Sequence, residues 1–153
     1  MKRFVLVAIL CIGACVVAAC GDDDEAALSE QEFLEQGNAI CAAGNERLDA
    51  AFEDLALEEG EEPTAEQIET LLVDVFLPDV QSQIDDVRAL EPPDELADEV
   101  EEFLDNAQAT LDELEQQAAD DPSSVFSGDE DPFAEVNAQA NEIGLTECAD
   151  DGE

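Results

Sequence analysis

The chain has 153 residues, of which 43 are Asp or Glu and 4 are Lys or Arg, so its formal net charge is −39. This charge excludes electrostatic binding to nucleic acid or to the face of an anionic bilayer, because both need a basic surface. The sequence contains no His, no Trp and no Tyr. We therefore predict no cofactor and no zinc, copper, haem or ferritin-type iron site, because the ligands for these are lacking.

The N-terminus has the pattern of a secretory signal. Lys2 and Arg3 precede an uncharged, mostly apolar run of 16 residues that ends at Ala19. A basic start, a short apolar core and small residues at its end predict a cleaved signal peptide over residues 1–19. The run is slightly short for a membrane-spanning helix, which needs roughly 17 to 25 residues.

The end of this leader carries a more specific pattern. Val17-Ala18-Ala19-Cys20 resembles the lipobox of bacterial lipoproteins, with Val17 in the place of the usual Leu. The resemblance implies that Cys20 receives acyl chains such as palmitate and becomes the mature N-terminus. It also implies a location on the extracytoplasmic face of the cell membrane. An ordinary signal peptide and an uncleaved anchor are the alternatives.

Residues 20–28 are expected to form an acidic tether between the lipid and the folded domain. Four consecutive acids occupy Asp22 to Glu25. Such a run is solvated and extended, and it repels anionic lipid. A calcium-bridging role for the same acids is the alternative.

Two cysteines remain in the mature chain after Cys20, and they are Cys41 and Cys148. In an exported domain two such cysteines usually join, so we predict a structural disulfide between them. A metal site or a redox pair is disfavoured, because His and the Cys-x-x-Cys spacing are both missing. On the chain-entropy model, closing so long a loop stabilises the fold by about 4.7 kcal/mol.

Apolar residues recur at intervals of three and four through residues 29–148, which predicts an all-α, four-helix bundle-like domain. The first helix is expected from Ser29 to about Leu57, with Glu32 completing a capping box. Its core-facing stripe comprises Phe33, Gly37, Ile40, Gly44, Leu48, Ala51, Phe52 and Leu55. Since glycine weakens a helix interior, Gly37 and Gly44 predict the close approach of another element, with a ligand groove as the alternative.

A second helix is expected to begin at Thr64, where Gln67 completes another capping box. Pro78 lies inside its apolar stripe. Proline lacks an N–H and clashes with the preceding turn, so we expect a kink or break near Phe76. Two further prolines after Leu90 end this helix.

The remaining two helices follow from similar signals. The third helix is expected over residues 94–118, and residues 122–130 are expected to be a loop. The fourth helix is expected to take Asp131 as its N-cap and Gly144 as a left-handed C-cap. Residues 149–153 are expected to form a frayed tail.

Three short segments suggest relatives for the whole domain. The domain resembles uncharacterised small helical lipoproteins of high-GC Gram-positive bacteria. That group has no assigned activity, so the resemblance implies fold and location alone. The segments that carry it are Asn38-Ala39-Ile40-Cys41, Leu90-Glu91-Pro92-Pro93-Asp94-Glu95-Leu96 and Gly144-Leu145-Thr146-Glu147-Cys148.

Arg47 and Arg88 are the only basic residues that follow Cys20. We expect each to form an ion pair with a nearby carboxylate. The alternative is that one of them binds an anionic ligand, which the strongly negative charge of the chain disfavours.

These observations predict that the protein is not an enzyme, since histidine is the commonest general base. An enzyme with paired carboxylates is the alternative that would need two acids converging in one pocket. We predict a non-catalytic binding module whose partner is a basic protein or another envelope component. The alternative function is calcium or magnesium binding, or adaptation to salt, although the acids at 129–131 lack the spacing of an EF-hand.

Overall fold

The structure is a computed structural model that describes residues 27–55, 63–125 and 131–149. These residues form helices and no strand, which confirms the predicted all-α fold class. The predicted signal peptide, Cys20 and nearly all of the tether lie outside the described residues. Within the described parts of the chain, none of the helices combines the length and apolarity that crossing a membrane requires.

The first helix, α1, begins and is capped as predicted. It spans Glu30–Asp54 and therefore ends before the expected Leu57, while residues 56–62 lie outside the described part. Ser29 Oγ accepts the N–H of Glu32 at 3.4 Å, and the Glu32 carboxylate accepts the N–H of Ser29 at 3.2 Å. Hydrogen bonds from the Ser29 hydroxyl and backbone hold the pKa of Glu32 below its ordinary value.

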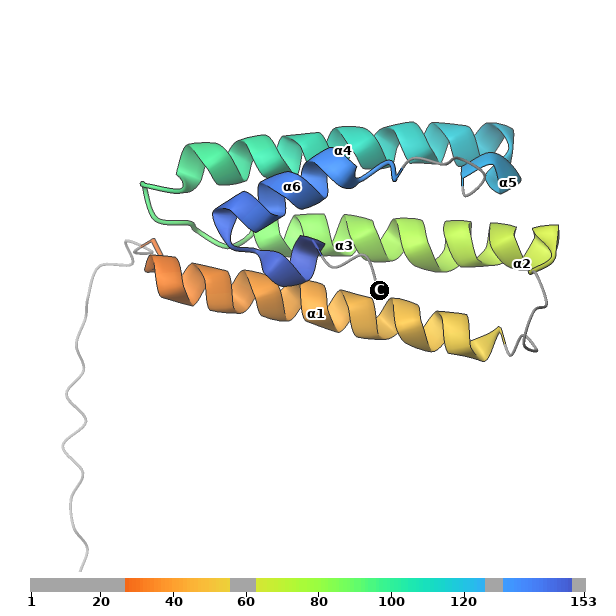
Figure 1. Ribbon diagram of the computed structural model, residues 1–153, viewed down its shortest axis with the longest axis horizontal. Helices are drawn as coiled ribbons and strands as arrows, with labels where there is room; N and C mark the ends of the chain where they lie inside the picture. The colour runs from red at the N-terminus through yellow and green to blue at the C-terminus, as the bar shows by residue number, and fades with distance from the viewer. Residues whose placement is uncertain (1–26, 56–62, 126–130, 150–153) are drawn as a thin grey trace, which may run out of the picture.

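The second predicted helix is one rod made of three consecutive elements (Figure 1). The Thr64 and Gln67 capping box forms as expected. The irregularity near Phe76 is a π-helical turn rather than a break, in which the Leu77 N–H donates to the Leu72 carbonyl. This wider turn accommodates Pro78, which has no N–H of its own to donate. The elements are α2 (Ala65–Thr70), the π-helix η1 (Leu71–Phe76) and α3 (Leu77–Arg88).

The third helix, α4, spans Ala97–Asp120, three residues later than its expected start. The residues before it form a turn in which the Leu96 N–H donates to the Pro93 carbonyl at 2.9 Å. The expected loop at 122–130 is partly wrong, because Pro122–Val125 forms the short helix α5. Pro122 at a first helical position favours that turn, since its fixed φ suits a helix and its missing N–H is not needed there.

The fourth helix, α6, spans Ala134–Ile143 and does not begin directly after Asp131 as expected. The Asp131 side chain still caps the turn before this helix, because its Oδ1 accepts a hydrogen bond from the N–H of Phe133 at 2.9 Å. Gly144 has φ 99°, which confirms the predicted left-handed C-cap. The 3-10 helix η2 (Thr146–Ala149) follows, so Ala149 is helical and not part of a frayed tail.

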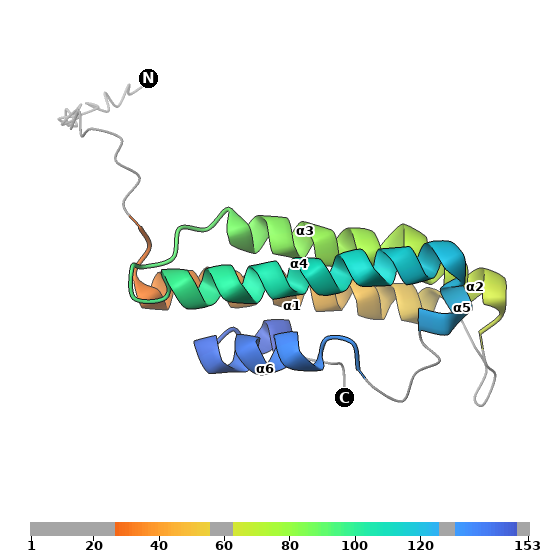
Figure 2. The same ribbon diagram turned by 90° about the horizontal axis from the view of Figure 1, so that it is seen from above.

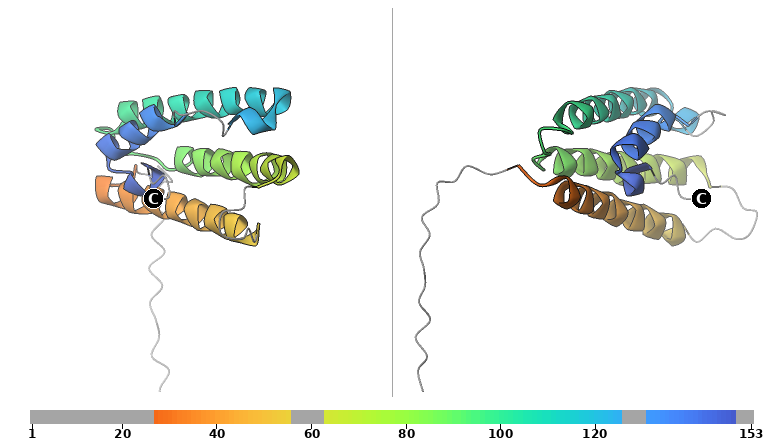
Figure 3. Two further views of the ribbon diagram at one scale, coloured as in Figure 1. Left: turned by 45° about the vertical axis from the view of Figure 1, so that its right-hand side comes forward. Right: turned by 60° about the vertical axis from the view of Figure 1, so that its left-hand side comes forward.

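Three long rods lie side by side, with the α2–η1–α3 rod between α1 and α4 (Figure 1). Helix α6 crosses this layer obliquely on one face and packs on α4, while η2 packs on α1 (Figures 2 and 3). The bundle is therefore three long helices covered on one face by a shorter C-terminal unit.

The core cluster draws side chains from α1, the α2–η1–α3 rod, α4 and the C-terminal unit. No polar or charged residue is fully buried among the described residues. Leu28, assigned to the tether by sequence, packs against the core and donates its N–H to the Glu91 carbonyl at 2.9 Å. The largest fully buried side chains are Phe33, Leu72, Leu111, Leu145 and Val87.

Candidate ligand pocket

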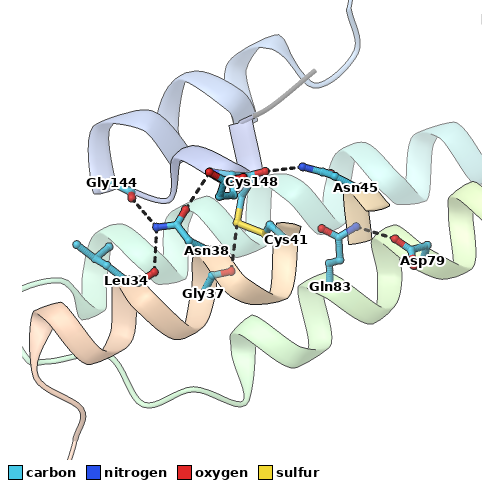
Figure 4. Close-up of a disulfide and its surroundings, with 10 residues drawn as sticks. Leu34, Gly37, Asn38, Cys41, Asn45, Asp79, Gln83, Gly144 and Cys148 are labelled. Carbon is cyan, nitrogen blue, oxygen red and sulfur yellow. Dashed lines mark hydrogen bonds between the residues drawn. A yellow bond between two sulfur atoms is a disulfide. The ribbon is translucent and has the colours of Figure 1, made fainter. Parts of the chain in front are cut away.

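A disulfide fixes the C-terminal unit to the bundle. Cys41 of α1 and Cys148 of η2 are joined as predicted, with an S–S distance of 2.00 Å and a Cα–Cα distance of 4.9 Å (Figure 4). Cys41 is buried in the core cluster, and Cys148 packs against it. The bridge ties the end of the described chain to the middle of its first helix.

Two asparagines of α1 hold the same segment on either side of this bridge (Figure 4). Asn38 Nδ2 donates to the Gly144 carbonyl at 3.0 Å, and Asn38 Oδ1 accepts the Glu147 N–H at 2.9 Å. Asn45 Nδ2 donates to the Glu147 carbonyl at 2.9 Å. Sequence reasoning did not assign these roles, although positions 38, 41 and 45 share one helix face by their spacing.

Gly37 and Gly44 of α1 lie where another part of the chain comes close, as predicted from their places in a helix interior. A Cβ on Gly37 would lie 2.6 Å from Leu145 Cδ2, and a Cβ on Gly44 would lie 2.1 Å from Gln83 Nε2. Neither glycine lines the pocket described next. Gly37 therefore makes room for Leu145, which lies just before η2, whereas Gly44 meets only the end of the flexible Gln83 side chain of α3.

A pocket of about 390 Å³ opens beside the disulfide, between α1, α3, α4 and the C-terminal unit. Its volume is within the range of small-molecule sites, and such sites are mostly apolar with a few polar groups. The apolar lining consists of Cys41, Leu48, Phe52, Phe76, Val80, Ile84, Val87, Phe103, Leu104, Ala107, Phe133, Val136 and Cys148.

Four phenylalanines from different elements dominate this lining. The rings of Phe76 and Phe133 meet edge to face, with centroids 6.2 Å apart and planes at 67°. Phe103 is buried, whereas Phe52 is 52% exposed and was wrongly expected to face the core. The C-terminal unit packs on the first half and the middle of α1 through η2, so it does not cover the far end of that helix (Figure 1).

The polar part of the lining contains two carboxylates, Asp49 and Asp131, and the amides of Asn45, Gln83 and Asn137. Asp131 Oδ2 accepts the Asn137 Nδ2 at 3.2 Å. The structure gives Asp49 no hydrogen bond or ion pair within the described part of the chain, and both carboxylates are exposed. No Lys, Arg or His is among the described residues that line the pocket.

The two arginines that sequence analysis singled out lie outside the pocket and pair with carboxylates. Arg47 Nε donates to Oδ1 of the largely buried Asp79, linking α1 to α3. Arg88 Nη2 lies 3.7 Å from Asp105 Oδ1 and donates to the Leu104 carbonyl at 3.3 Å. Because both guanidinium groups have protein partners, the alternative of an anionic ligand gains no support.

No cluster of three or more metal-ligating side chains exists within the described parts of the chain. The acids at 129–130 and those of the tether lie outside those parts. The described residues therefore form a mostly apolar pocket and contain no such cluster of metal ligands.

Neither protein-family models, curated proteins nor solved structures give a match to this chain. The geometry of the pocket and the pattern of the leader thus carry the functional argument.

Proposed function

We propose that the mature protein is a lipid-anchored extracytoplasmic lipoprotein that binds an envelope component without catalysing a reaction. The leader pattern and its lipobox-like end support acylation of Cys20 and attachment to the cell membrane. Two or more acyl chains hold a protein on a membrane stably, whereas one chain binds only marginally. The likeness to small helical lipoproteins of high-GC Gram-positive bacteria is part of this proposal.

The observation that carries the binding role is the apolar pocket beside the disulfide. Its wall is held in place by the Cys41–Cys148 bridge and by the amide hydrogen bonds of Asn38 and Asn45. A preformed wall lowers the ordering cost of binding. The pocket is thus suited to take up an apolar group.

The chemistry of the lining supports a role without catalysis. The sequence has no histidine, and its single lysine, Lys2, lies in the leader. A hydrolase with paired carboxylates holds one acid protonated in an apolar environment. Asp49 and Asp131 line one pocket, as that alternative required, but both are exposed to solvent.

Binding in the pocket is tested with the neutral fluorescent probe N-phenyl-1-naphthylamine on the mature protein. Saturable enhancement at one probe per chain is expected. Val80→Phe adds volume inside the pocket from a half-buried position and should abolish this signal. Val73→Phe is the matched control, because Val73 is 44% exposed and outside the lining. Equal probe binding by both variants would contradict the assignment.

Anchoring is tested by labelling a high-GC Gram-positive host with an alkyne analogue of palmitate. The wild-type protein should be labelled and sediment with membranes, and Cys20→Ala should be unlabelled and released. Cys15→Ala, inside the leader, serves as the control and should keep the label. Label retained in Cys20→Ala would contradict the proposed lipidation site.

A further inference from the structure

We propose that the pocket selects a cationic amphiphile, meaning an apolar chain or ring system that carries an ammonium or amidinium group. This inference rests on the proposed binding role and adds the chemical class of the ligand. It follows from the apolar lining, the sign of the charges at its rim and the presence of aromatic rings in the lining.

The apolar body of such a ligand has a defined place. Val87, Phe103, Leu104 and Ala107 are each 5% exposed or less and form the inner wall. Burying an apolar chain against them removes its surface from water, which drives binding in proportion to the area buried. A small polar or fully hydrated cation would gain nothing from this wall.

The charged end of the ligand is selected by the rim. Asp49 belongs to α1, and Asp131 precedes α6, so the two carboxylates reach the pocket from different elements. Both are exposed. A cation beside either carboxylate therefore keeps part of its hydration and avoids the large cost of a buried charge. An anionic head group would be repelled by both carboxylates and by the formal net charge of −39.

The two arginines do not neutralise the negative charge of the carboxylates at the rim of the pocket. The guanidinium of Arg47 is engaged by Asp79, which also accepts the Gln83 side-chain N–H at 2.7 Å. Arg88 lies against Leu104 and Asp105, and neither arginine lines the pocket.

The aromatic rings of the lining add a second preference for a cation, because an aromatic face attracts a cation placed over it.

The test compares three amphiphiles of decyl chain length at fixed ionic strength, below their micelle-forming concentrations. Decyltrimethylammonium is cationic, decyl maltoside is neutral and decanoate is anionic. Calorimetry on the mature protein gives each affinity, and circular dichroism verifies that the helices persist. Side-chain amide signals of Asn45, Gln83 and Asn137 in NMR spectra report whether the probe enters the pocket, because all three line it.

The key variant is Asp49→Asn/Asp131→Asn, in which the amide oxygen at 131 can still accept the Phe133 N–H that Asp131 accepts now. The matched control is Asp86→Asn/Asp120→Asn, which removes the same charge from exposed positions outside the lining. Two exposed ion pairs amount to a preference of roughly 2- to 30-fold for the cation over the neutral amphiphile. The preference should vanish in the key variant and persist in the control.

Three results would overturn the inference. Equal affinity for the cationic and neutral amphiphiles would remove the charge selection while leaving pocket binding intact. An equal loss of preference in both double variants would show that net charge, and not the rim, selects the cation. Failure of all three amphiphiles to shift the amide signals would contradict the proposed binding role itself.

Discussion

The structure allows a clear prediction of how much stability the protein loses when the Cys41–Cys148 bridge is removed. The two cysteines are 107 residues apart in sequence, so the bridge closes nearly the whole folded domain into one loop. For a loop of about 100 residues, the chain-entropy model gives a loss near 4.7 kcal/mol when the bridge is removed. The hydrogen bonds of Asn38 and Asn45 remain, so the double variant Cys41→Ala/Cys148→Ala should still fold.

The assay is urea denaturation followed by circular dichroism at fixed ionic strength. Urea is preferred because a guanidinium salt would also screen the negative charges and change the stability by itself. The variant should unfold at a lower urea concentration and with a steeper slope, since the unfolded chain without the bridge is less compact. Wild-type protein reduced with a thiol should match the double variant.

A loss below about 1 kcal/mol would refute this reasoning, because the bridge would then place little constraint on the unfolded chain. A double variant much less stable than the reduced wild type would point instead to the packing of the buried Cys41 side chain, which is 3% exposed. Together, the two comparisons separate the stability that the cross-link adds from the stability that packing of the cysteine side chains adds.

Three further predictions concern packing, capping and charge. Leu145→Ala should lower the free energy of unfolding by about 2–5 kcal/mol, because this leucine is fully buried; exposed Val73→Ala should change it by no more than about 0.5 kcal/mol in the same urea titration. Ser29→Ala should raise the pKa of Glu32 in an NMR titration, because it removes the hydroxyl bond. The stability that this bond contributes is present above the ordinary pKa of 4.5 and is lost as pH falls through the lowered value; a pKa that does not move would contradict the assignment. Sodium chloride should raise the melting temperature, because it screens the repulsion between the acids. If screening is the whole effect, calcium at matched ionic strength should raise it equally, and an extra rise with calcium would favour the cation-binding alternative.

The local features of the fold could be predicted because their causes are local. The two capping boxes need only residues three positions apart, and the left-handed cap at Gly144 needs one glycine. Pro78 marked the irregular turn, but the proline alone does not distinguish a kink or break from the π-helical turn that forms. The start of α6 shifted because Asp131 caps through a turn that precedes the helix.

The pocket could not be predicted from the sequence for a physical reason. Its four phenylalanines come from α1, η1, α4 and the turn before α6, and each has the spacing of a core residue. Periodicity identifies the apolar face of each helix but not whether the facing elements fill the space between them. Phe52 shows this limit, since it shares the apolar stripe of α1 and is nevertheless 52% exposed.

The most direct test of the account is an NMR structure of the mature protein bound to decyltrimethylammonium. The aromatic signals arise from phenylalanine alone, because the sequence has no His, Trp or Tyr. The account predicts contacts from the decyl chain to the rings of Phe76, Phe103 and Phe133, and none to Phe33, which is fully buried outside the pocket. Contacts that avoid the three pocket rings, or that fall on another surface of the bundle, would contradict it.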